Sequence, residues 1–240
     1  MFQEIFDTGN YLNLQSDNSF GDKLMRVLKV YGLLLLLLVF AVGPLTALTD
    51  KFVTVVMHHK SLNELNRNLF KQLHKKIGFV NSILFVCLLG PMFEELIFRF
   101  PLSFTKRRVT IALIIALFYF SASFYHPHSL VMLKLSIEVI VTLIIGGLCY
   151  AFVPDTPLNI SPKRKTQLIV LSITLFGLMH ISNYQPIDLP LLWIYPIYVI
   201  PQVVLGFGIT YVRFKNGFGW GLALHCLINT ITTLFTFWVK

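Results

Sequence analysis

The chain has 240 residues, of which 55% are hydrophobic and only 13% are charged, and its mean hydropathy is +0.71. This composition excludes a soluble globular domain, which carries about 25% charged residues, and also excludes disordered, collagen-like, coiled-coil and disulfide-stapled chains. The net charge of +9 comes from short basic clusters between apolar runs, which are typical of topology signals and lipid-headgroup contacts. We therefore expect an integral membrane protein in a lipid bilayer that binds no nucleic acid.

Residues 1–76 are predicted to form an amino-terminal arm, a first membrane span and an interfacial helix. Residues 1–22 are polar and predict a loose arm. This stretch is too long to begin a cleavable signal peptide, so the apolar run Leu28–Leu48 predicts a retained span. The basic stretch Lys51–Lys76 is typical of an amphipathic helix at the membrane interface, because it has four leucines at helical spacing: Leu62, Leu65, Leu69 and Leu73.

Residues 77–240 contain six further apolar runs, each near the ~20 residues that span a bilayer. The runs are Ile77–Phe98, Val109–Tyr125, Leu130–Val153, Leu168–Ile181, Leu189–Val212 and Gly219–Val239. Lipid permits only helices or closed barrels, and runs this apolar cannot be the alternating strands of a barrel. We expect an all-α, polytopic transmembrane bundle of about seven spans plus the interfacial helix.

Basic residues predict which loops face the cytoplasm. The loops around Lys106, Lys163 and Arg213 are basic, whereas the intervening loops carry no lysine or arginine. Alternation then places the basic loops inside. The same alternation places the basic stretch Lys51–Lys76 outside, so either this helix breaks the rule or one of the first two apolar runs is re-entrant.

Two adjacent carboxylates, Glu94 and Glu95, interrupt an apolar run four residues before Arg99. Ionisable groups within apolar runs are costly and indicate functional sites. Because residues four apart share a helix face, we expect Arg99 to hold Glu95 ionised, which leaves Glu94 to face a cavity. The alternative is that the helix ends near Pro91 and both acids lie in water.

Two histidines lie in later apolar runs, each with a companion on the same helix face. His180 follows Phe176 by four residues, and His225 precedes Asn229 by four. A lone buried histidine is most often a satisfied core residue. Burying two imidazoles, an amide and two carboxylates on three helices without a shared purpose would be expensive. We therefore expect one polar cavity lined by all three helices.

Such a cavity suits hydrolysis by activated water. An apolar pocket disfavours the charged form of Glu94 and so strengthens it as a general base. Glu94, His180 and His225 could bind a metal such as zinc with an open position for water. Without a metal, the imidazoles could position the water and, with Asn229, donate hydrogen bonds to a developing oxyanion. Neither version uses a serine or cysteine nucleophile.

These residues resemble the motifs of the CPBP intramembrane proteases, which include the CaaX prenyl endopeptidases and the bacterial Abi proteins. Three motifs occur in order: Glu94-Glu95-x-x-x-Arg99, Phe176-x-x-x-His180 and His225-x-x-x-Asn229. The likeness covers roughly residues 77 to 235, so residues 77–240 are expected to form the protease core. The family often has glycine after the motif arginine, where this chain has Phe100. This difference bears on local packing and substrate access.

The resemblance implies a bacterial plasma-membrane endopeptidase, open to the cytoplasmic side, that cleaves a membrane-associated peptide or protein, and it leaves open whether that substrate is lipidated. It assigns the water-activating base to Glu94, with the remaining motif residues completing or supporting the site: Glu95, Arg99, Phe176, His180, His225 and Asn229. Both metalloprotease and metal-free mechanisms are argued for the family, so zinc stays open. Two other hypotheses also stay open. One is a proton-coupled transporter with a Glu94–Glu95–His180 relay, and the other is a catalytically silent immunity or binding protein.

Overall fold

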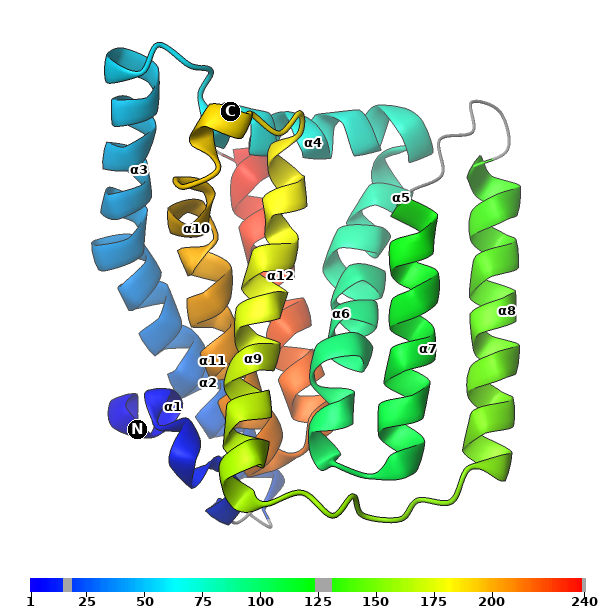
Figure 1. The fold of residues 1–240 in the computed structure, drawn as a ribbon. Helices are drawn as coiled ribbons and strands as arrows, with labels where there is room; N and C mark the ends of the chain where they lie inside the picture. The colour runs from blue at the N-terminus through cyan, green and yellow to red at the C-terminus, as the bar shows by residue number, and fades with distance from the viewer. Residues whose placement is uncertain (15–18, 124–130, 239–240) are drawn as a thin grey trace. The chain divides into compact units, whose positions relative to one another are not determined.

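The computed structural model describes residues 1–14, 19–123 and 131–238, and within these ranges it contains helices and no strand (Figure 1). The chain divides into two compact units. The first comprises Met1–Pro91 and Val170–Lys240, and the second comprises Met92–Ile169. The expected all-α class is confirmed, and each unit is described by itself below.

The first unit contains a long helix of 37 residues, Phe20–Val56. At about 1.5 Å per residue it is about 55 Å long, well beyond the roughly 30 Å hydrocarbon core of a bilayer. Two wider π-helical turns interrupt it. Its consecutive segments are α2 (Phe20–Leu37), η2 (Leu38–Val42), α3 (Gly43–Lys51) and η3 (Phe52–Val56).

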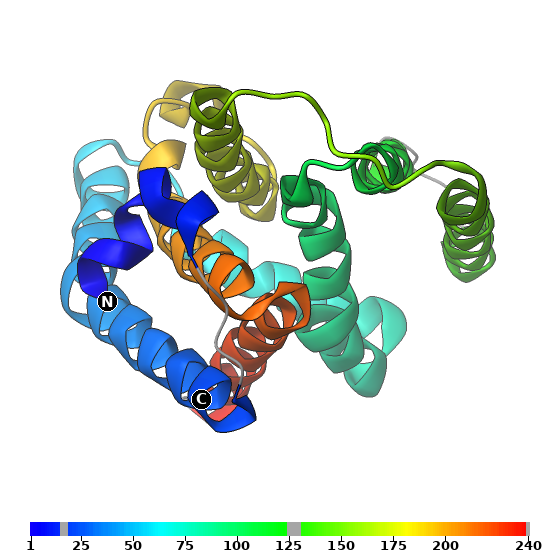
Figure 2. The ribbon, with the colours of Figure 1, turned by 90° about the horizontal axis from the view of Figure 1, so that it is seen from below.

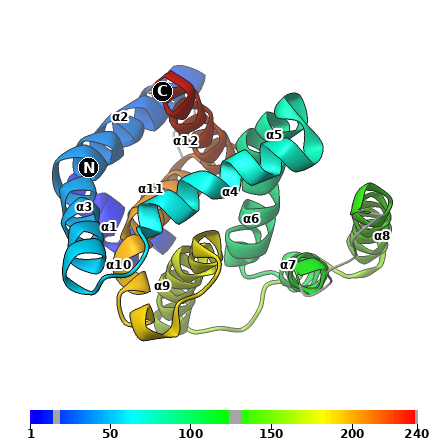
Figure 3. The same cartoon turned by 90° about the horizontal axis from the view of Figure 1, so that it is seen from above.

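Helix α4 (Leu62–Ile77) connects this long helix to the next one and crosses the end of the first unit (Figures 1 and 3). Its start is fixed by Asp50, whose Oδ1 accepts hydrogen bonds from the Leu62 amide and from the Tyr198 hydroxyl. Leu62 is fully buried in an apolar cluster with tyrosines that include Tyr198. The amphipathic helix expected between the first two spans is therefore present, and it is tied to the bundle at its amino-terminal end.

A second continuous helix, Phe79–Phe98, follows. It is built from α5 (Phe79–Leu84), the π-helical turn η4 (Phe85–Leu89) and α6 (Gly90–Phe98). The Gly90 amide donates to the Phe85 carbonyl five residues back, which is the π register. Glu94 therefore lies within a continuous helix that runs past Pro91, so the alternative in which the helix ends there is wrong.

Helix α11 lies between α2 and α12 in the first unit, and Gly208 on α11 packs directly against Leu34. The remaining helical segments of this part are α9 (Pro162–Met179), η6 (His180–Tyr184), η7 (Leu189–Leu191), α10 (Tyr195–Tyr198), α11 (Ile200–Asn216) and α12 (Phe218–Trp238). The expected single span Leu189–Val212 is wrong, because separate helical segments begin at Leu189, Tyr195 and Ile200, each with a proline as its second residue.

The amino-terminal arm is folded onto α11 (Figure 2). It consists of α1 (Phe2–Phe6) and the 3₁₀ helix η1 (Thr8–Asn13). The Tyr11 hydroxyl donates to the Phe207 carbonyl at 3.3 Å, and the Tyr211 hydroxyl donates to Glu4 at 2.8 Å. Ile5 and Tyr11 are almost fully buried. The expectation of a loose arm is therefore wrong.

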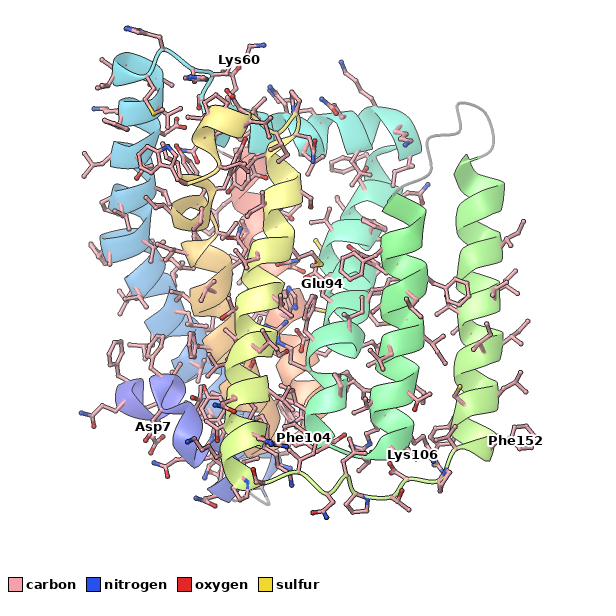
Figure 4. All side chains as sticks on the ribbon, viewed as in Figure 1. Asp7, Lys60, Glu94, Phe104, Lys106 and Phe152 are labelled. Carbon is pink, nitrogen blue, oxygen red and sulfur yellow. The ribbon has the colours of Figure 1, made fainter. Side chains whose placement is uncertain are left out.

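The second unit contains a tight turn and two helices that pack side by side, η5 (Phe100–Ser103), α7 (Lys106–Ser123) and α8 (Val131–Phe152). The segment after α8 returns to the start of α7. There the Lys106 amide donates to the Thr156 carbonyl at 2.9 Å, and the Arg107 guanidinium donates to the Val153 carbonyl at 2.6 Å. Figure 4 labels Lys106 and Phe152 at this end of the unit.

Four helices in the described part of the chain are long and apolar enough to cross a membrane: Phe20–Val56, Phe79–Phe98, Pro162–Tyr184 and Phe218–Phe235. The protein is thus an integral membrane protein, but the count of about seven spans is not confirmed. Helix α7 begins with three basic residues. The apolar stretch described within α8, Ile140–Phe152, is shorter than these four helices. Leu130, the start of that expected run, lies outside the described residues.

Candidate active site

Two imidazoles flank one phenyl ring in the first unit. The Phe176 ring near the end of α9 lies edge-on to His180 with centroids 4.9 Å apart, and edge-on to His225 of α12 with centroids 5.6 Å apart. Phe176 and His225 are 2% and 3% exposed. The structure therefore brings together two histidines from distant parts of the sequence, as the sequence predicts for one cavity.

The orientation of His180 is set by the backbone of its own helix. Its Nδ1 lies 2.8 Å from the Phe176 carbonyl oxygen. A carbonyl oxygen only accepts, so Nδ1 carries the hydrogen, and in the neutral ring Nε2 keeps its lone pair. A nitrogen of that kind can accept a hydrogen bond from water or bind a metal ion.

Gly177 allows the helix that carries Phe176 to approach α11 closely. A Cβ atom at Gly177 would lie 2.3 Å from Cγ2 of Val203, far inside the van der Waals limit. Glycine is therefore required where the two helices touch, one residue after Phe176 and three before His180. Close packing at this point supports the position of both rings.

Asn229 lies one turn after His225 on α12, next to η4. Its Nδ2 donates to the Val86 carbonyl at 2.9 Å. Along the same contact, the Cys87 thiol approaches the Thr233 hydroxyl at 3.7 Å. Two polar contacts thus join α12 to the π-helical turn, and the first of them fixes the amide plane of Asn229.

The second unit holds the carboxylates. Arg99 Nη1 lies 3.2 Å from Glu95 Oε1, and both side chains are fully buried, so the two residues form the ion pair that their spacing predicts. Glu94 lies one residue earlier on α6 and is partly buried. Figure 4 labels it on this helix. A buried guanidinium keeps a neighbouring carboxylate ionised and restrains its rotamer.

Sequence reasoning missed Tyr119 of α7. Its ring packs against Phe93 with centroids 6.2 Å apart, and its phenol is close enough to Glu94 to interact with that charge. A tyrosine inside an apolar run was the available signal, because a phenol buried there needs a polar partner. Tyr119 therefore joins the group of residues around Glu94.

Phe100 stands where the family often has glycine, and it packs in a basic turn. The Arg108 guanidinium lies over the Phe100 ring at 5.6 Å from its centroid, and Arg108 also pairs with Asp155 at 3.9 Å. The aromatic ring thus supports an arginine at the start of α7. The departure from the family pattern affects local packing in this turn.

The predicted site residues fall into two groups. Phe176, His180, His225 and Asn229 belong to the first unit, and Glu94, Glu95 and Arg99 belong to the second. Within either unit taken by itself, the described residues contain no group of three His, Cys, Asp or Glu side chains that could hold a metal. A site of two imidazoles and a carboxylate requires both groups, and their convergence stays a prediction.

The fold and these residues place the chain in the class of intramembrane endopeptidases of the CAAX type. The family model for type II CAAX prenyl endopeptidase Rce1-like proteins matches residues 76–231, which is more than half of the chain, and the chain belongs to this family. The resemblance inferred from the three motifs is thereby confirmed. Neither the curated proteins nor the solved structures include a significant match.

Proposed function

We propose that the chain hydrolyses a peptide bond of a membrane-held, lipidated substrate with a water molecule activated by Glu94. The observation that carries this proposal is that the imidazoles of His180 and His225 both contact the Phe176 ring, with Asn229 one helical turn after His225. His225 is buried and His180 and Asn229 are partly buried, and placing three such polar groups within apolar helices is expensive unless they share a purpose. All of them lie within the segment that matches the protease family.

Glu94 takes the proton of the attacking water in this scheme. Glu95 forms an ion pair with Arg99, so the two adjacent carboxylates have different roles. The buried ion pair positions α6, and Glu94 next to it accepts a proton and later returns it to the leaving amine. Tyr119 packs against Phe93, the residue before Glu94, and so supports this turn of α6.

The imidazoles and Asn229 bind the water and the substrate carbonyl. Neutral His180 offers Nε2 as an acceptor, because its Nδ1 hydrogen is held by the Phe176 carbonyl. Asn229 keeps a second amide hydrogen after its bond to Val86, and that hydrogen can stabilise the developing oxyanion. His225, almost fully buried beside Phe176, completes the set.

A zinc ion is compatible with the donors present. His180 shares one feature with metal-binding histidines, a ring nitrogen that donates to a backbone carbonyl. If the two units bring them together, His180, His225 and Glu94 would provide three ligands and leave a fourth position for water. When bound, zinc would make that water more acidic and polarise the substrate carbonyl.

The proposed location is a bacterial plasma membrane, with the site open to the cytoplasm. The basic residues that support this side are Lys106, Arg107, Arg108, Lys163, Arg164 and Lys165. In the first unit, basic residues lie both on α4 and in the last turn of α11. We therefore assign the cytoplasmic side from the basic residues of the second unit alone.

The experiment compares parent and Glu94→Gln membranes for proteins whose termini change. The proposal expects specific cleavage products in the parent only, at equal expression of both chains. Purified parent is then assayed with the identified substrate, with and without a zinc chelator, because loss of activity that zinc restores indicates a metal enzyme. Proton flux in liposomes without any cleavage would point to a transporter and would contradict the proposal. An intact biological effect in Glu94→Gln/His180→Ala would point to a silent binding protein.

A further inference from the structure

One backbone carbonyl on η4 has no helical hydrogen-bond donor because a proline stands at the donor position. It accepts a hydrogen bond from the Asn229 side-chain amide instead. In the π register the Gly90 amide donates to the Phe85 carbonyl. The next donor in that register would be residue 91, and its acceptor would be the Val86 carbonyl. Pro91 has no amide hydrogen. The Val86 carbonyl instead accepts from Nδ2 of Asn229 at 2.9 Å.

A released carbonyl within an apolar helix needs a partner from outside the helix. Proline is tolerated in membrane helices because neighbouring helices satisfy the groups that it frees. A backbone carbonyl left without a partner in a low-dielectric site is unfavourable. The Asn229 amide supplies the missing hydrogen, so the proline and the asparagine, far apart in sequence, form one hydrogen-bonding unit.

We infer that Pro91 is a positioning residue for Asn229, an inference that rests on the proposed function. The Val86 carbonyl fixes which side of the Asn229 amide is the nitrogen, because a flipped amide would place two oxygens together. One hydrogen is held by Val86 and the second has a fixed direction. A donor that is oriented before the reaction does not have to be reoriented in the transition state.

The chain offers a matched control. Gly43 and Pro44 follow η2 in the same way that Gly90 and Pro91 follow η4, and the Gly43 amide also donates five residues back, to the Leu38 carbonyl. The carbonyl released there belongs to Val39, whose side chain is 54% exposed. The helix Phe20–Val56 carries none of the proposed site residues. Pro44→Ala therefore reports the effect of restoring an amide hydrogen after a π-helical turn.

The test uses four variants of the full chain in nanodiscs: Pro91→Ala, Pro44→Ala, Asn229→Ala and Pro91→Ala/Asn229→Ala. We expect Pro91→Ala to lower kcat about 10-fold with KM unchanged, because the new amide competes for Val86. Removing an oxyanion donor outright costs about 10²–10³-fold, and Asn229→Ala should approach that loss. Pro44→Ala should retain the parent kcat. In the Asn229→Ala background, Pro91→Ala should have no further effect.

A second measurement does not depend on activity. With ¹⁵N-labelled asparagine, the side-chain amide of Asn229 should show one hydrogen that is protected from exchange in the parent and in Pro44→Ala, and unprotected in Pro91→Ala. Retained protection in Pro91→Ala, or additive losses in the double variant, would overturn the inference. If Asn229→Ala keeps the parent kcat while protection still depends on Pro91, the role of Asn229 in the proposed function fails and the positioning by Pro91 stands.

Discussion

The ring of Phe176 and the imidazole of His225 meet edge to face, with their planes at 86° and their centroids 5.6 Å apart. The positive edge of one ring faces the negative face of the other, an arrangement worth about 0.5–1.5 kcal/mol beyond the area buried. Because Phe176 makes a similar contact with His180, one phenyl ring contacts both imidazoles and restrains both, which we call its spacer role. This gives the Phe of the second motif a physical role.

Phe176→Leu should therefore lower peptidase activity more than it lowers stability. Leucine fills part of the volume but offers no ring edge to either histidine, so we expect kcat to fall about 10-fold and thermal stability to fall by only about 1 kcal/mol. The measurement is steady-state kinetics beside thermal unfolding. Phe207→Leu, on α11 against Phe6 of the arm, is the control. Equal kcat losses in both variants would contradict the spacer role.

Gly177→Ala should destabilise the protein and move His180. Its Cβ would lie 2.3 Å from Val203 Cγ2, so α9 and α11 must separate, at a cost of about 1–3 kcal/mol for overpacking. The additional change Val203→Ala should restore part of both stability and activity. Gly147→Ala on α8, where a Cβ meets nothing within 4 Å, should be neutral or stabilising. A stable, fully active Gly177→Ala protein would show that the close contact is not required.

Glu95→Gln should affect folding rather than chemistry. It leaves the buried Arg99 guanidinium without the carboxylate 3.2 Å away, and breaking a buried pair costs about 3–5 kcal/mol. Glu94→Gln, one residue earlier, should unfold near the parent temperature. Thermal unfolding of both variants in the same detergent checks the difference. Two variants with equal stability would remove the distinction between a structural and a catalytic carboxylate.

The exposed side of α4 should bind anionic lipid. Arg67, Lys71 and Lys75 follow one another at four-residue spacing on exposed positions, opposite the face that carries Leu62 and Leu65. Each cation near a negative surface contributes about 1 kcal/mol. Lys71→Glu/Lys75→Glu should therefore reduce the anionic lipid that copurifies with the protein, and should shift thermal stability in vesicles that contain phosphatidylglycerol. In pure phosphatidylcholine vesicles the variant should match the parent, and an equal shift there would contradict lipid binding.

Much of the architecture could be predicted from the apolar runs. Their length and composition are sufficient for an all-α membrane protein, and the four-residue spacing of Glu95 and Arg99 is sufficient for their ion pair. The prediction for Leu189–Val212 was wrong because the apolar count outweighed Pro190, Pro196 and Pro201, each of which is the second residue of a separate segment. Hydrophobicity alone does not show where a helix is broken.

Other features depend on contacts that the sequence pattern does not display. The amino-terminal arm is polar on average, which predicts a loose segment, yet Ile5 and Tyr11 are almost fully buried and the arm packs on α11. The bond between Asn229 and Val86 involves a backbone carbonyl, whose only sequence signal is the Gly-Pro pair after η4. A Gly-Pro pair indicates such a hydrogen bond only when the helix that packs against it is known.

The most direct measurement of the central claim is the turnover of purified Glu94→Gln in liposomes, on a substrate that the parent cleaves. The account predicts that cleavage falls at least 10³-fold while folding, lipid binding and the Glu95–Arg99 pair are retained, because the water loses its general base. Glu64→Gln, on the exposed side of α4, should cleave at the parent rate. Turnover by Glu94→Gln close to that of the parent would contradict the account.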